Sequence, residues 1–225
     1  MLKNISNLGD AALYCDFGIQ VNKATNLEVI KYFNTIREKK IKGVNNLTPS
    51  YNKLIISFDL RVTNFSEIKN KIENLDTTIE QNKNNKKIEV PVCCEENFAL
   101  DKSRLEKKLN LSYQEILTKF FDKEYFCYMT GFIAGMPFLG DIDENLRTQR
   151  LETPRVKVPQ GSVGITEQFA NIYTFDSPGG WNIIGNTPLK VFDDSKERDP
   201  NLINPGDTVI FKKISRQEHE SSNEK

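Results

Sequence analysis

Two stretches within the first sixty residues alternate apolar with polar or small side chains, a pattern typical of strands with one buried face. Leu13, Cys15 and Phe17 form the first stretch, and KLIISFDL at 53–60 forms the second. Apolar residues recur at helical spacing after each stretch, which predicts two amphipathic helices. Their inward residues are Val29, Ile30, Phe33 and Ile36 in the first helix, and Phe65, Ile68, Ile72 and Leu75 in the second. Together these elements predict a small α+β sandwich domain over residues 1–80.

Polar residues mark the ends of these predicted elements. Thr25 and Glu28 form a predicted capping box for the first helix, and Asn64 is a predicted N-cap for the second. Residues 45–49 contain two asparagines and a proline and predict a turn region. QNKNNKK at 81–87 has no apolar anchor, which predicts a linker or an exposed loop.

The second half of the chain is richer in glycine and proline and has shorter apolar segments than the first. Nine of the twelve glycines and seven of the nine prolines fall within residues 131–225. After a strand at 88–94 and two short helices with Asp101 and Ser112 as N-caps, short apolar segments alternate with turns. The predicted strands are 125–132, 156–158, 162–165, 171–175, 181–184, 189–192 and 207–214. This spacing predicts a β-sandwich or closed barrel over residues 88–215, followed by a disordered tail at 216–225.

Composition excludes several classes of function. Thirty-one basic and thirty-one acidic residues balance, which argues against a dedicated nucleic-acid or anionic-membrane binder. The start has no apolar core of signal-peptide length, and no later segment is long and apolar enough to span a membrane, so the expected location is cytoplasmic. Four cysteines without CxxC spacing predict reduced thiols. The one histidine, His219, falls in the predicted tail, which argues against a Ser-His-Asp triad and a histidine-rich zinc site.

The densest concentration of candidate chemistry lies at 131–188. Arginine is scarce, at eight residues against 23 lysines, yet Arg147, Arg150 and Arg155 fall within nine residues. Arg155 precedes a Gly161-Ser162 turn whose backbone N–H groups could bind a carboxylate or phosphate together with the guanidinium. Phe138 and Trp181 lie in Gly- and Pro-rich segments suited either to lining a cleft or to filling a core. Neither GxxxxGK[ST] nor GxGxxG occurs, so the chain offers no recognisable nucleotide site.

Four motifs occur in a characteristic order: GFxxGxPFLG at 131–140, TPRxxVPxGSVGI at 153–165, SPGGWxxIGxTP at 177–188 and NPGDxVxF at 204–211. Together they closely resemble the allophanate hydrolase subunit 1 family, which includes B subunits of bacterial 5-oxoprolinase and a sporulation histidine-kinase inhibitor. GDAALYCDFG at 9–18 and YNKLIISFD at 51–59 extend the resemblance over most of the chain. The resemblance implies an N-terminal α+β domain followed by a cyclophilin-like β-barrel.

The resemblance also implies a function. The chain is expected to be a B-type subunit, inactive alone, of an ATP-dependent complex that opens 5-oxoproline to glutamate. The implied partners are a companion barrel subunit of C type and an amidohydrolase-like A subunit, with ATP consumed by the complex. The expected substrate-binding residues are Arg155, Gly161, Ser162, Phe138, Trp181 and Thr187. Phe138 and Trp181 are also the expected apolar anchors of a subunit interface.

One departure from the family leaves two alternatives open. Family members commonly have a histidine before the GF strand, and Phe120 stands there in this chain. Losing this acid–base candidate favours a non-enzymatic protein that inhibits a sensor histidine kinase. A third interpretation, an allophanate or urea amidolyase-type subunit, follows from the family name alone.

Overall fold

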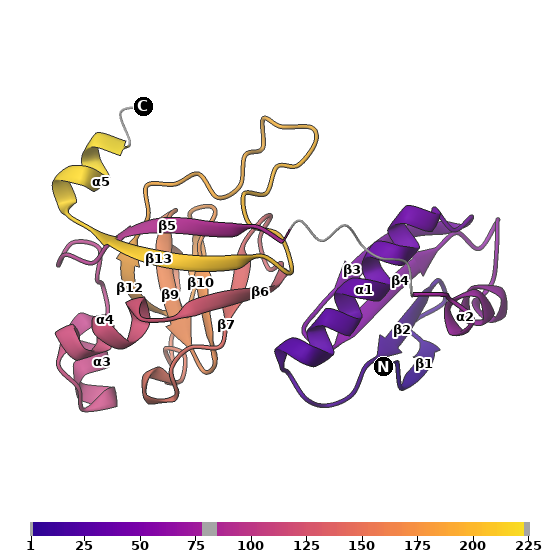
Figure 1. The fold of residues 1–225 in the computed structure, drawn as a ribbon, viewed down its shortest axis with the longest axis horizontal. Helices are drawn as coiled ribbons and strands as arrows, with labels where there is room; N and C mark the ends of the chain where they lie inside the picture. The colour runs from indigo at the N-terminus through magenta and orange to yellow at the C-terminus, as the bar shows by residue number, and fades with distance from the viewer. Residues whose placement is uncertain (1, 78–84, 223–225) are drawn as a thin grey trace. The chain divides into compact units, whose positions relative to one another are not determined.

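A computed structural model describes residues 2–77 and 85–222 and divides the chain into two compact units, residues 1–84 and 85–225 (Figure 1). The predicted linker at 81–87 falls mostly outside the described residues, and its last residue, Lys87, begins a strand of the second unit.

The N-terminal unit is an antiparallel sheet packed with two helices. The sheet has the order β1-β2-β4-β3, formed by Asn4–Asn7, Ala12–Asp16, Lys53–Phe58 and Val44–Pro49. The helices are α1, Lys23–Lys39, and α2, Phe65–Glu73. The alternating residues of β2 and β4 point inward as predicted, because Leu13, Leu54 and Ile56 are fully buried against apolar residues of both helices.

Several details of this unit differ from the sequence prediction. The N-cap of α1 is Asn22, whose side chain accepts from the Thr25 N–H at 2.9 Å, so the predicted capping box at Thr25 is wrong. Asn64 caps α2 as predicted. The predicted turn at 45–49 belongs instead to β3, where Pro49 is tolerated because the strand lies at the sheet edge.

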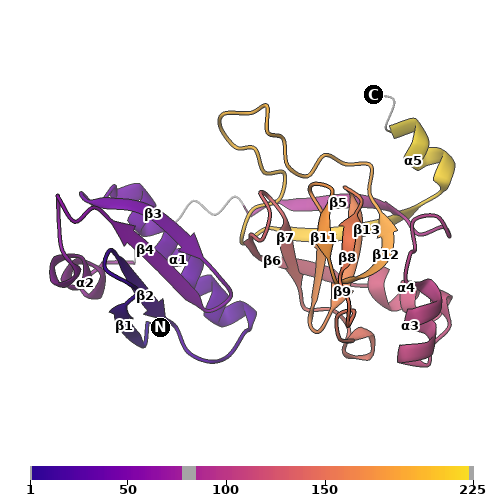
Figure 2. The same cartoon turned by 180° about the vertical axis from the view of Figure 1, so that it is seen from behind.

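The second unit is a closed barrel (Figure 2). Its strand order is β10-β7-β6-β13-β5-β12-β9, and β9 pairs with β10 to complete it. Most neighbours are antiparallel, but β13 runs parallel to β5. The barrel strands are β5 Lys87–Cys93, β6 Glu124–Thr130, β7 Pro137–Gly140, β9 Ser162–Thr166, β10 Phe169–Ile172, β12 Asn182–Asn186 and β13 Thr208–Ile214. A separate ribbon pairs β8, Arg155–Val158, with β11, Ser177–Gly179. The predicted α+β class with a barrel is confirmed.

Helices cover parts of the barrel unit. They are α3 Lys102–Leu109, α4 Tyr113–Phe121, the 3-10 turn η1 Glu144–Leu146 and α5 Arg216–Ser222. The predicted capping box of Ser112 and Glu115 is present at the start of α4. Asp101 occupies the N-cap position of α3, but its side chain makes no capping bond.

Three predictions for this unit are wrong. Residues 137–140 lie outside every predicted strand, yet they form strand β7, which pairs with β6 and β10. The expected strand at 189–192 is loop with a single bridge from Phe192 to Asn201. The expected disordered tail forms helix α5 over 216–222, because Ser215 and Glu218 cap it and His219 packs inward at 5% exposure. Residues 223–225 lie outside the described part of the chain.

Candidate functional site

Arg155 forms an ion pair with Asp101 across the barrel unit. Its Nη2 lies 2.7 Å from Asp101 Oδ1, and the other carboxylate oxygen accepts from the Ile183 N–H at 2.7 Å. The Asp101 side chain is 4% exposed and that of Arg155 is 27% exposed. Burying a carboxylate this deeply is costly unless a cation and hydrogen-bond donors accompany it, and Arg155 and the Ile183 N–H supply both. The aspartate predicted as a helix cap therefore orients Arg155 and fixes the start of β12.

The same guanidinium retains an unused donor. Arg155 Nη1 is buried and makes no hydrogen bond to any residue that the structure describes. A buried guanidinium nitrogen without an acceptor is energetically unfavourable, and an anionic oxygen is the acceptor that matches it best. The role of Arg155 in binding an anion stays a prediction, and Nη1 is the atom that would donate to the anion.

Tyr173 lies close to Arg155 and was not among the predicted site residues. Its side chain is 1% exposed, and burial raises the pKa of its phenol. Hydrogen bonds from Asn171 and from the Trp181 backbone, together with the charges of Arg150 and Arg155, act in the opposite direction on this pKa. The net direction is upward, so Tyr173 is a protonated hydrogen-bonding group at neutral pH. Only the fold, which places two arginines beside it, distinguishes it from other core tyrosines.

Phe138 and Trp181 pack against each other in the barrel. Their ring centroids are 5.6 Å apart in an edge-to-face arrangement, and the Arg150 guanidinium carbon lies 5.7 Å from the Trp181 ring centroid. The two rings are only 7% and 5% exposed. Both are therefore core residues of this chain, one of the two roles that their sequence setting left open, and this low exposure does not favour them as interface anchors. Substrate binding by either ring stays a prediction. The Trp181 ring also packs against the Arg150 guanidinium.

Gly161, Ser162 and Thr187 form a tight backbone junction. Gly161 has φ of +78°, and a Cβ on it would lie 2.4 Å from the Thr187 carbonyl oxygen, so only glycine fits. The Gly161 N–H donates to the Tyr173 carbonyl at 2.7 Å, and the Ser162 N–H donates to the Pro159 carbonyl at 3.2 Å. Both amides predicted to bind a ligand already have acceptors within the protein. Ligand binding by these residues stays a prediction, and the contacts seen are structural.

His219 lies beside this junction rather than in a disordered tail. Its Nε2 is 2.8 Å from Asn186 Oδ1, and Asn186 in turn donates to the Gln160 carbonyl at 2.8 Å. The imidazole packs on Phe98 with ring centroids 4.4 Å apart. Burial lowers its pKa below the ordinary value of 6.5, with Glu220 opposing the shift. The one histidine thus links α5 to the turn that leads into β9.

Phe120 occupies a fully buried position at the end of α4. It stacks on Phe211 with ring centroids 4.8 Å apart, and its carbonyl accepts from the Tyr125 hydroxyl at 2.7 Å. The residue at the place of the family's histidine is therefore part of the aromatic core.

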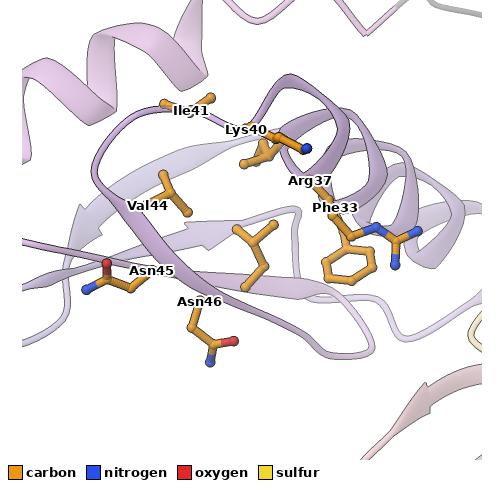
Figure 3. A pocket seen from close by; sticks show the side chains of 9 residues that line it. Phe33, Arg37, Lys40, Ile41, Val44, Asn45 and Asn46 are labelled. Carbon is orange, nitrogen blue, oxygen red and sulfur yellow. The ribbon is translucent and has the colours of Figure 1, made fainter. Parts of the chain in front are cut away.

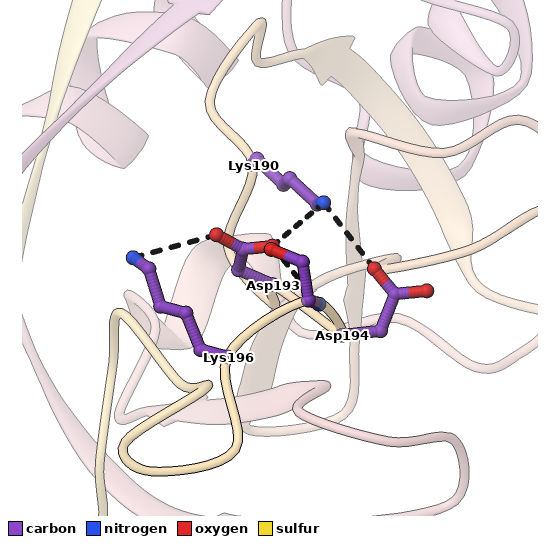
Figure 4. Close-up of polar contacts among 5 residues, drawn as sticks. Lys190, Asp193, Asp194 and Lys196 are labelled. Atoms are coloured by element: carbon purple, nitrogen blue, oxygen red, sulfur yellow. Dashed lines mark hydrogen bonds and ion pairs between the residues drawn. The ribbon is translucent and has the colours of Figure 1, made fainter.

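Other polar groups of the described chain do not extend this site. Lys190 pairs with Asp193 at 2.8 Å and Asp194 at 3.3 Å, while Lys196 pairs with Asp193 at 3.4 Å, so these loop charges neutralise one another (Figure 4). Within residues 2–77 and 85–222, no three His, Cys, Asp or Glu side chains are grouped to hold a metal ion. No helix in those residues is long and apolar enough to cross a membrane.

Comparison with known proteins identifies the family. Residues 3–203 match the family described as carboxyltransferase domain, subdomain C and D, and the chain belongs to this family. It is 31% identical to the B subunit of 5-oxoprolinase from Bacillus subtilis, over 98% of this chain and 96% of that protein. It is 43% identical to the B subunit of 5-oxoprolinase from Haemophilus influenzae, over 55% of this chain and 58% of that protein.

A solved structure supports the same assignment. The crystal structure of TTHA0988 aligns with a TM-score of 0.82 and 27% identity, covering 92% of this chain. The chain spans only 40% of that longer protein. The resemblance inferred from the four motifs is thereby confirmed, and the names of the relatives favour the subunit interpretation over both alternatives.

The buried Arg155–Asp101 pair should contribute to the stability of the barrel unit. Asp101→Ala, Arg155→Ala and the double variant form a double-mutant cycle in chemical denaturation. We expect a coupling free energy of about 2 kcal/mol, since removing one partner strands the other. The exposed pair Lys87–Glu124 is the control, with a smaller expected coupling. Coupling at Asp101–Arg155 no larger than in the control would contradict this account.

His219 should make stability depend on pH. Because its pKa is lowered in the folded state, the unfolded chain binds a proton first as the pH falls through 6.5. Its contribution is therefore complete above that pH and is lost as the pH falls toward the folded value. Between about pH 7.5 and about pH 5.5, the wild type should lose more stability than His219→Gln, measured by denaturation at each pH. Equal losses in the two proteins would show that His219 does not titrate differently on folding.

Proposed function

We propose that this chain is the B-type subunit of an ATP-dependent 5-oxoprolinase complex, which opens 5-oxoproline to glutamate. The observation that carries the proposal is the 31% identity to the B subunit of a 5-oxoprolinase over 98% of this chain. Both the sheet unit and the barrel unit fall within that match. The proposed partners are a companion barrel subunit of C type and an amidohydrolase-like A subunit.

The chemistry of the substrate fits the unused donor of the site. 5-Oxoproline carries a carboxylate beside its lactam, and Arg155 Nη1 is a buried cationic donor without an acceptor among the described residues. Asp101 holds the guanidinium in place through Nη2, which leaves Nη1 as the donor that we assign to the carboxylate of the substrate. Tyr173, with its raised pKa, remains a neutral neighbour rather than a competing negative charge.

The rest of the reaction falls to other subunits. Ring opening adds water to the lactam carbonyl and breaks its C–N bond, so a group must move protons near neutral pH. In this chain Phe120 is core and His219 is hydrogen-bonded to Asn186. No phosphate-binding loop occurs in the sequence, and ATP is proposed as a reactant of the complex. The role of this chain is therefore to bind and orient, and its partners supply acid–base groups.

The proposed location is the cytoplasm. All four cysteines are unpaired and buried. Free thiols are typical of proteins in reducing compartments, whereas proteins in oxidising compartments commonly pair their cysteines in disulfides.

Reconstitution tests the function. The chain alone should show no turnover, and the three subunits together should hydrolyse ATP only when 5-oxoproline is present. Arg155→Lys keeps a cation for Asp101 but removes the second guanidinium nitrogen, so KM for 5-oxoproline should rise about tenfold. Arg147→Lys, at an exposed arginine paired with Glu144, is the matched control. Turnover by the chain alone would refute the subunit role, and an unchanged KM in Arg155→Lys would refute only the role of Nη1.

Association with the companion barrel subunit should depend on exposed apolar residues near the barrel end. Phe132 is 71% exposed and has φ of +70°, two unfavourable features for an aromatic residue. Phe132→Ser should weaken the complex about tenfold in titration calorimetry, because buried aromatics dominate interfaces. Ile19→Ser, at a 95% exposed residue of the N-terminal unit, is the control and should bind normally. Equal binding by both variants would place the interface elsewhere.

A further inference from the structure

The N-terminal unit contains a pocket of about 430 Å³ between the end of α1 and strand β3 (Figure 3). It is lined by Phe33, Ile36, Arg37, Lys40, Ile41, Val44, Asn45, Asn46 and Leu47. Its volume lies within the range of pockets that bind small molecules. The residues that line it are distinct from those of the barrel, so nothing described for Arg155 accounts for it.

The floor of the pocket is apolar, and its rim carries two basic side chains, Arg37 and Lys40, beside two asparagines, Asn45 and Asn46. Phe33, Ile41, Val44 and Leu47 are half-buried, and they extend the core around the fully buried Ile36. Arg37 lies on the rim with its guanidinium carbon 5.1 Å from the Phe33 ring centroid. This arrangement holds a positive charge directly beside an apolar surface.

The positive charge continues along the chain. Residues 37–42 contain four basic side chains and one acidic one, and the basic ones, Arg37, Lys39, Lys40 and Lys42, are all exposed. Basic residues at a helix C-terminus interact favourably with the helix dipole, which explains part of this excess. Lys40 and Lys42 lie beyond the last residue of the helix, so the interaction with the helix dipole does not account for these two charges.

Strand β3 forms the other side of the pocket and lies at an edge of the sheet. Within the described residues, it pairs with β4 and has no strand on its other side. A free edge can accept an extended chain through backbone hydrogen bonds. A register shift between Val44 and Asn46 and the absence of an N–H on Pro49 limit the usable edge to the middle of the strand.

We propose that this pocket and the adjacent edge of β3 bind an extended segment of a partner protein, in which an apolar residue is flanked by acidic residues two positions away. The added strand lies beside β3, its apolar side chain enters the pocket, and its acidic side chains reach Arg37 and Lys40. The proposal concerns a surface of the N-terminal unit and does not depend on the oxoprolinase function.

Strand geometry sets the spacing of this motif. Side chains at i and i+2 of a strand share one face and lie about 6.5–7 Å apart. If the central apolar residue occupies the pocket, the residues at i−2 and i+2 both face α1 and its basic rim. The matching sequence is therefore acidic-x-apolar-x-acidic, in an extended conformation.

Charge favours a different chain over a second copy of this one. Pairing two β3 strands around a twofold axis would bring two clusters of Arg37, Lys39, Lys40 and Lys42 together. Like charges placed across an interface oppose association. An acidic partner segment instead gains attraction from the same side chains, and its binding should weaken with salt.

Synthetic peptides test the proposal with the full chain. An array of short peptides presents Glu-x-Φ-x-Glu, where Φ is a large apolar residue, beside matched peptides with Lys in place of Glu. The tightest acidic peptide is then measured by calorimetry and by NMR at low and physiological ionic strength. We expect acidic peptides to bind, Lys peptides not to bind, and shifted amide signals to lie in residues 33–48.

Two variants and one modified peptide separate the parts of the proposal. Arg37→Glu combined with Lys40→Glu should weaken binding at least about tenfold, since it reverses the rim charge. Lys71→Glu, at the exposed basic residue in the last turn of α2, is the matched control and should bind normally. A peptide N-methylated at alternate residues should also bind at least about tenfold more weakly, because it cannot form the ladder with β3.

Four outcomes would overturn the proposal. The first is that no acidic peptide binds better than its Lys counterpart, and the second is that the Arg37/Lys40 variant and the Lys71 variant bind equally well. The third is that N-methylation of the peptide leaves its binding unchanged. The fourth is that the NMR signal changes are confined to the barrel unit. Sedimentation that shows dimers of the free chain disrupted by Arg37→Glu would also overturn it, since the occupant would then be a second copy.

Discussion

Much of the second unit depends on the parallel pairing of β13 with β5 within the barrel. Seven consecutive residue pairs align Thr208–Ile214 with Lys87–Cys93, whereas β5 meets β12 at a single pair, Asn186 with Cys93. Asp207 fixes the start of this register, because its carboxylate accepts from the Lys86 and Asn204 N–H groups at 2.9 Å each. The aspartate of the NPGD motif thus links two segments that lie 121 residues apart in the chain. Loop closure of that length must be offset by such a set of concerted contacts.

The site inherits its geometry from this closure. Helix α5 follows β13 directly, and this places His219 within hydrogen-bond distance of Asn186, beside the Gly161 turn. Near the other end of β12, Asp101 binds the Ile183 N–H and orients Arg155. The result is a site in which these polar groups are hydrogen-bonded within the protein, while one guanidinium nitrogen, Arg155 Nη1, has no acceptor among the described residues. Such a site suits binding and orientation better than proton transfer.

The N-terminal unit offers a different kind of surface. It has an apolar pocket with basic side chains at its rim, and the adjacent edge of β3 has no neighbouring strand within the described residues. These features suit the recognition of a partner segment that we propose. A protein whose barrel binds a small anion and whose other unit binds an extended segment would divide these tasks between two separate cores. Each core, one around Leu13 and Ile56 and the other around Val90 and Phe211, is built from its own elements.

The amino-acid sequence by itself determined the features that rest on local periodicity and short motifs. Alternation predicted β2 and β4, capping residues predicted the starts of α2 and α4, and glycine and proline spacing predicted a β-sandwich or barrel, of which the family resemblance implied the barrel. The four motifs identified the family. Local signals suffice here because the period of a strand or helix is fixed by backbone geometry.

Only the tertiary structure decided what the site residues contact. Asp101 had the local appearance of a helix cap, yet its partner Arg155 is 54 residues away. His219 had the appearance of a tail residue, and α5 is ordered because a barrel surface carrying Phe98 and Asn186 is there to receive it. Phe138 and Trp181 could equally have been wall or core, and their neighbours made them core. These outcomes depend on contacts between distant residues, which carry no periodic signal along the chain, and so the fold had to be known before they could be assigned.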